Sequence, residues 1–128
     1  EYSSIVEAAL KVDEIIEREA AKIGLIHVDG KKEFALGPGR KVVLVDTFGT
    51  LDEDRWWDAE AYANGETIEL SKEFVRSHYI STGHQANLKA ARDSGSDEPP
   101  IPALPQSVID QTANLYSSMY ERLTSEKF

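Results

Sequence analysis

The sequence contains no cysteine, few basic residues and no long hydrophobic run. Without thiols the chain has no disulfide bond, no cysteine nucleophile and no sulfur-ligated metal site. Its 14 lysines and arginines stand against 23 acidic residues, and the formal net charge of −9 disfavours binding to nucleic acid or to an anionic membrane surface. The apolar run at 42–45 is far shorter than the roughly 20 residues that a membrane-spanning helix needs.

The start of the chain gives a further expectation. It opens with Glu1 instead of methionine, and no basic-then-apolar leader is present. We therefore expect a cytoplasmic protein that is a piece of a longer polypeptide. A length of 128 residues supports one domain with a hydrophobic core.

An amphipathic helix is expected over residues 3–23. Apolar residues recur there at steps of three and four, which predicts one buried stripe. Ser3 or Ser4 can cap the first turn, and Gly24 stands just beyond the last. The charged residues of the segment are expected on its solvated face.

Three short segments at 25–28, 32–36 and 41–45 are predicted strands, because each is apolar or alternates polar with apolar residues. The sequence GPGR at 37–40 is a strong turn signal. It is not a phosphate-binding loop, because neither Lys-Ser nor Lys-Thr and no helix follows it. We expect an antiparallel pair that ends on a buried strand at 41–45.

The second half of the chain is less regular. Residues 46–70 are crowded with charges and aromatics, and 71–80 are expected to form a short helix. Residues 93–105 hold four of the five prolines and predict an extended loop, whereas 107–123 form the closing amphipathic helix. The expected fold class is α+β, a small antiparallel β-sheet packed with N-terminal and C-terminal helices.

Two carboxylates and a lysine are the first candidate site. Lys31 and Glu33 are two residues apart in a predicted strand, so both point to one face, and Asp46 ends the next strand. Such a group can hold a magnesium ion against a phosphate chain. A cross-strand surface ion pair, with Asp46 as an ordinary strand end, is the structural alternative.

Two further groups can bind anions. Arg55 follows three acidic residues, the first of which is Asp52. These acids can hold the arginine rigid while its planar guanidinium group faces a carboxylate or phosphate. The alternative is a solvated acidic turn with two core tryptophans. Lys72 and Arg76 are one helical turn apart and form a second candidate, unless they are a surface pair matched with Glu73.

The three histidines show no metal-binding spacing, and we expect His27, His78 and His84 to be structural. No serine lies in a G-x-S-x-G pattern, so a serine hydrolase has no support.

Four blocks of the sequence, taken in order, resemble the C-terminal half of phosphoribosylaminoimidazole-succinocarboxamide synthase (SAICAR synthetase). The family pattern D-x-K-x-E-F matches 29–34, and D-E-x-x-T-P-D-S-S-R-F-W aligns on 46–57. D-K-Q-x-x-R aligns on 71–76, and P-x-L-P on 102–105. The resemblance covers essentially residues 5–128. Among the departures from these patterns, as in a divergent, archaeal-like subfamily, are Thr47, Leu51, Glu53, Asp54 and Ser71.

The resemblance implies an ATP-dependent ligase of purine biosynthesis, which joins L-aspartate to the carboxylate of carboxyaminoimidazole ribonucleotide. It implies ATP and magnesium as cofactors, with Glu33 and Asp46 at the magnesium–nucleotide site. Lys31 would contact phosphate or the reacting carboxylate. Asp52 and Arg55 would hold the imidazole nucleotide, and Lys72 and Arg76 would add contacts to that anionic substrate.

The resemblance also implies that residues 1–128 are the C-terminal half of such a ligase. No segment resembles the glycine-rich lobe that covers the nucleotide, so we expect a preceding segment or a companion chain to supply it, and the isolated chain to be inactive. A homo-oligomer is left open. The alternatives are a non-catalytic binding or assembly module on the same scaffold and a hydrolase that uses Glu33 and Asp46 as a carboxylate pair.

Overall fold

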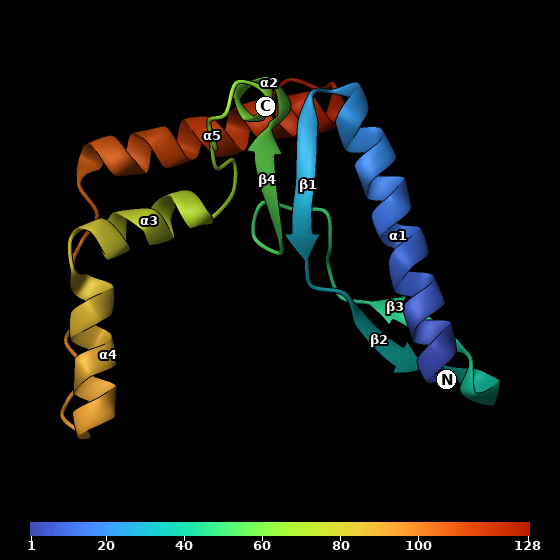
Figure 1. The fold of residues 1–128 in the computed structure, drawn as a ribbon, viewed down its shortest axis with the longest axis horizontal. Helices are drawn as coiled ribbons and strands as arrows, with labels where there is room; N and C mark the ends of the chain where they lie inside the picture. The colour runs from blue at the N-terminus through green and yellow to red at the C-terminus, as the bar shows by residue number, and fades with distance from the viewer.

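Two long helices, α1 (Tyr2–Lys22) and α5 (Gln106–Thr124), frame a central antiparallel ribbon in the computed structural model, which describes all 128 residues (Figure 1). The α+β class is as expected. The remaining elements, in chain order, are β1 (Leu25–Gly30), β2 (Glu33–Leu36), a 3-10 turn (Pro38–Arg40), β3 (Val42–Val45), β4 (Asp54–Asp58), α2 (Ala59–Ala63), α3 (Glu73–Ser81) and α4 (His84–Ser94).

Helix α1 has the predicted stripe, which runs from Ile5 to Ile23 and is half-buried or buried along its length. The expected serine cap is wrong, because the helix begins before the serines and Glu1 occupies the cap position without a side-chain hydrogen bond. Gly24 follows α1 with φ +70°, where a glycine has no steric cost, and the chain turns there into β1. Arg122 of α5 donates to the carbonyls of Ile23 and Gly24 at 2.8 Å, which fixes α5 against this turn.

The strands form two ribbons of two strands each. β1 pairs with β4, and β2 pairs with β3 across the predicted turn. The expected burial of 41–45 is wrong, because Val43 and Val45 are 43% and 37% exposed. The opposite face of β3, with Val42 and Leu44, is partly covered, and α1 packs against this strand.

The segment 46–70, which we expected to be irregular, contains β4 and α2. In β4 a buried position alternates with an exposed one, from Asp54 through Arg55 to Trp56. The alternation is not evident from the sequence, because the buried residue at the start of the strand is the charged Asp54. Asp58 then caps α2 by accepting from two backbone N–H groups, chiefly that of Ala61, and these bonds lower the pKa of its carboxyl group.

Helices α3 and α4 form an arm, in which α3 runs below α5 and contacts it, and α4 extends away from the end of α3 (Figure 1). Helix α3 was expected, but α4 was not, and α4 includes the first two residues of the predicted loop at 93–105. The rest of that loop has no regular structure. Tyr79 donates to the carbonyl of Pro102 at 2.9 Å and so ties the loop to α3.

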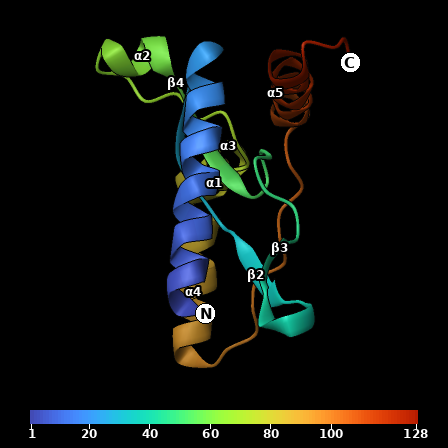
Figure 2. The same ribbon diagram turned by 90° about the vertical axis from the view of Figure 1, so that its right-hand side faces the viewer.

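The hydrophobic core is small and lies where α1, β1, β4 and α5 meet, near the top of Figure 1. Figure 2 shows α5 nearly end-on, to one side of α1. The buried apolar residues are Ala20, Leu25, Leu51, Trp56 and Met119. None of the helices has the length and apolar character that crossing a membrane requires.

Trp56 is the largest side chain of this core, so its truncation tests the packing. We expect Trp56→Ala to lower the free energy of unfolding by about 3–5 kcal/mol, through lost burial and a residual cavity. Guanidinium denaturation followed by circular dichroism measures the change. Tyr2→Ala is the matched control, since Tyr2 is 80% exposed, and it should change the value by less than about 0.5 kcal/mol. Equal effects of the two substitutions would contradict the core described here.

A charged candidate site beside the β1–β4 ribbon

Lys31 lies at the centre of a cluster of carboxylates. Its Nζ donates to Glu33 Oε1 at 2.6 Å and lies 3.7 Å from Asp46 Oδ2 and 3.8 Å from Glu53 Oε2. These neighbours, Glu33 first, raise the pKa of the Lys31 ammonium. The structure therefore brings together the three residues that the sequence pattern nominated, and it adds Glu53.

Asp46 adopts an unusual backbone conformation at the end of β3. Its φ of +68° lies in the left-handed region, which few residues other than glycine adopt but which aspartate tolerates. Its side chain accepts the N–H of Thr47 at 2.9 Å. Backbone strain of this kind is concentrated at functional sites, where it holds a side chain in a working position.

The donor atoms of the cluster are carboxylate oxygens, which magnesium prefers. No three acidic or histidine side chains in the structure converge closely enough to hold a metal ion alone. Magnesium keeps several waters and takes further oxygens from substrate phosphates, so one or two carboxylates are enough to bind it. Glu33 and Asp46, which already share the cation of Lys31, fit that requirement.

Arg55 makes a different contact from the one expected. It binds Asp29 of β1 with two hydrogen bonds, one of them from Nε to Oδ1 at 2.7 Å, and not the acids next to it in sequence. This bond raises the pKa of the guanidinium and lowers that of Asp29. Asp29 and Arg55 are register partners, and the N–H of Lys31 bonds to the carbonyl of Glu53. The ion pairs Asp29–Arg55 and Lys31–Glu53 therefore follow one another along this end of the ribbon.

Asp52 is held elsewhere, by α5. The hydroxyl group of Tyr116 donates to Asp52 Oδ1 at 2.7 Å, and both residues line a cavity of about 320 Å³ together with Gly49 and Thr50. Asp52 bonds to Tyr116 and Arg55 to Asp29, so the two residues that were expected to hold one substrate belong to separate hydrogen-bonded groups. Burial and the bond to Asp52 raise the pKa of Tyr116 to about 12.

Lys72 and Arg76 line a second hollow, of about 380 Å³, with Tyr79 and His84. Arg76 also donates to Glu73, as the surface-pair alternative expected. Glu73 also contributes, after Asp29, to the raised pKa of Arg55. This hollow is mainly apolar with cationic groups at its edge.

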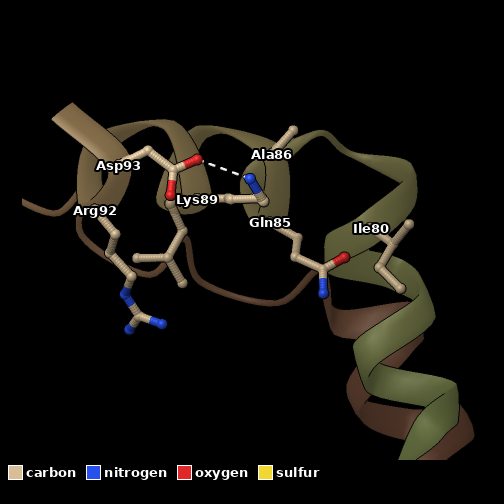
Figure 3. A pocket seen from close by; sticks show the side chains of 7 residues that line it. Ile80, Gln85, Ala86, Lys89, Arg92 and Asp93 are labelled. Atoms are coloured by element: carbon tan, nitrogen blue, oxygen red, sulfur yellow. Dashed lines mark hydrogen bonds and ion pairs between the residues drawn. The ribbon is translucent and has the colours of Figure 1, made fainter.

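The largest cavity lies apart from all of these residues. It has a volume of about 530 Å³ on the α3–α4 arm, and Figure 3 shows the Lys89–Asp93 pair along α4 at its wall. No candidate residue lines it. Volume alone therefore does not identify the site.

Two of the three histidines, His27 and His84, are buried. The His27 ring packs on Trp56, with centroids 4.9 Å apart.

Comparison with known proteins identifies the family. The sequence profile of SAICAR synthetase matches residues 1–92. The chain belongs to the SAICAR synthetase family. It is 52% identical, over its whole length, to the phosphoribosylaminoimidazole-succinocarboxamide synthase of Thermoplasma acidophilum, and it covers 44% of that protein.

Solved structures give the same result. A SAICAR synthetase in complex with ADP matches with a TM-score of 0.64 and 28% identity, over 99% of this chain and 39% of that one. The enzyme from Pyrococcus horikoshii matches with a TM-score of 0.60 and 29% identity, over 99% and 40%. The chain thus spans less than half the length of the SAICAR synthetases that it matches.

Sequence reasoning overlooked four charged residues around the site. Asp29 begins the D-x-K-x-E-F block and was not nominated, although it holds Arg55. Glu53 and Asp54 were treated as part of an acidic turn, and Lys32 as a polar strand position. The alternation of inward and outward residues from 53 to 57 was the one available signal.

Tyr116 offers a direct test of the Asp52 contact. Titration of tyrosine absorbance should show one group with a pKa of about 12, and Asp52→Asn should move it part of the way toward 10.0, because burial remains. The raised pKa contributes stability that is fully present below pH 10 and is lost as the pH rises through 12. Asp110→Asn on the same helix is the control. A tyrosine spectrum unchanged by Asp52→Asn would contradict the contact.

Proposed function

We propose that this chain supplies the C-terminal part of the active site of an ATP-dependent ligase, which joins L-aspartate to carboxyaminoimidazole ribonucleotide in purine biosynthesis. The proposal depends above all on the assembly of Lys31, Glu33 and Asp46 into one cluster, in a chain of the SAICAR synthetase family. An ADP complex of a similar protein supports nucleotide binding.

The roles of the residues follow from their chemistry. Glu33 and Asp46 would hold magnesium, which when bound neutralises phosphate charge. Lys31, between these acids, would contact a phosphate or carboxylate oxygen of the substrates through its ammonium group. The raised pKa of Lys31 keeps it cationic throughout the physiological pH range.

Arg55 is suited to orient an anionic substrate. Asp29 binds one edge of its guanidinium group and fixes the plane of the group, which leaves the remaining N–H groups for a carboxylate or phosphate. Lys72 and Arg76 would contact the same substrate from α3, and Asp52 would meet it from the turn before β4. Fixing the two reactants in one geometry is the main contribution that such residues make to a ligation.

Two departures from the family pattern are compatible with this role. Ser71 is fully buried and accepts the N–H of Glu73 at 3.2 Å, so it serves the start of α3 as an aspartate would. Thr47 is exposed, and its backbone N–H supports Asp46. Neither substitution removes a contact within the Lys31 cluster.

A companion segment is part of the proposal. The chain covers 44% of its Thermoplasma acidophilum relative, and apolar side chains remain exposed on α1 and on the β2–β3 ribbon. Among them are Leu10, Leu36, Val43 and Val45. We expect the nucleotide-binding lobe of a full-length enzyme to complete the cleft.

Calorimetry with magnesium–ATP tests the assignment. The chain is mixed with the part of the Thermoplasma acidophilum protein that it does not span. We expect metal-dependent binding that Glu33→Gln weakens about 10- to 100-fold, as the loss of about 1.5–3 kcal/mol for a bond to a charged group predicts. Glu98→Gln, which alters an exposed pair with Arg92, should leave it unchanged. No binding by the wild-type mixture would favour the non-catalytic module.

Product formation is the second test. The mixture, given ATP, L-aspartate and carboxyaminoimidazole ribonucleotide, should form the succinocarboxamide product, detected by chromatography. The isolated chain should form none, because its residues supply one wall of the cleft. Turnover by the isolated chain would refute the need for a companion.

A further inference from the structure

A buried ion pair lies directly behind the candidate site. Lys32 Nζ donates to Asp54 Oδ1 at 3.0 Å, and the two side chains are 5% and 0% exposed. The other carboxylate oxygen of Asp54 accepts the N–H of Gly49. Two more charged or titratable groups face the pair: Asp13 Oδ1 lies 3.8 Å from Lys32 Nζ, and His27 Nε2 lies 3.7 Å from Asp54 Oδ1.

The pair alternates with the site residues along the chain. In segments 31–33 and 53–55 the middle residue points into the protein, and the outer two carry the exposed charges described above. The middle residues are Lys32 and Asp54. Because side chains alternate along an extended backbone, fixing the middle residue fixes the direction of both its neighbours.

Gly30 leaves room for this pair. A Cβ at Gly30 would overlap the carboxylate group of Asp54 and would lie 2.7 Å from Lys32 Nζ. Gly30 is also the register partner of Asp54. The two strands therefore approach closely where the ion pair crosses between them.

Stability alone does not account for this arrangement. Removing two charges from water costs about as much as their attraction returns, and apolar pairs of the same size are often equally stable. A buried and directional ion pair fixes the relative orientation of the two segments that carry it. Through Gly49, Asp54 also closes the turn that carries Asp52.

We propose that Lys32 and Asp54 are positioning residues, which hold segments 31–33 and 53–55 so that their outer side chains present one ordered set of charges. The assignment of those outer residues to substrates rests on the proposed function. The positioning itself is a property of the chain and can be measured without substrate.

Two double variants test the proposal. K32Q/D54N removes both charges and retains the two hydrogen bonds, because the new amide groups can bond to each other and to the Gly49 N–H. K32Q/D54S also removes both charges, but a hydroxyl group is too short to reach both partners. The two variants therefore have the same charge and differ in whether residue 54 can bond to both of its partners. K89Q/D93N, which alters an exposed pair on α4, is the control.

The readout is the set of nuclear Overhauser contacts between segments 31–33 and 53–55, recorded at a temperature where circular dichroism shows each variant folded. We expect K32Q/D54N and the control to keep the wild-type contacts and K32Q/D54S to lose them. Equal contacts in the two double variants would overturn the proposal, even if their melting temperatures differ.

A charge-conserving variant covers the case in which K32Q/D54S does not fold. Lys32→Arg keeps the ion pair but lengthens one side, and should change the nuclear Overhauser contacts between segments 31–33 and 53–55. Unchanged contacts would overturn the proposal. Changed contacts together with absent magnesium–ATP binding by the wild-type mixture would leave the positioning role in place and remove only the proposed ligase function.

Discussion

The register between β1 and β4 is the constraint on which the site depends. With Asp29 opposite Arg55 and Gly30 opposite Asp54, one row of side chains faces the core and the other carries ion pairs. A slip of one residue would expose Trp56 and bury Arg55. The core would lose its largest side chain, and an unpaired charge would be buried. The hydrophobic core and the charged face therefore enforce the same pairing.

Local patterns were sufficient for much of the fold. The stripe of α1, the GPGR turn and the closing helix follow from periodicity and turn chemistry, which neighbouring residues determine. The Lys31–Glu33 contact followed from the two-residue period of a strand. The link to Asp46 followed from the hairpin, since Glu33 and Val45 are register partners.

Contacts between distant segments were not accessible in the same way. The partner of Arg55 is 26 residues away, and Tyr116 meets Asp52 across 64. From the sequence, Asp54 has the pattern of a solvated acidic turn and Lys32 that of an exposed strand residue. Each is buried against the other, and this pairing of distant residues is not visible in the local sequence. Helix α4 has little apolar content, and its place is set by α3 and the loop after it.

The charge balance of the Lys31 cluster points toward ligand binding. Three carboxylates around one ammonium group leave a local excess of negative charge, and exposed ion pairs of this kind contribute about 0–1 kcal/mol each. The repulsion among the acids offsets part of that gain, so stability gives no reason to gather them. A divalent cation with its phosphate ligands would relieve the repulsion and free the lysine at once. A protein with a net charge of −9 can attract an anionic substrate only through such local cations, and Arg55 stands next to the cluster on the same ribbon.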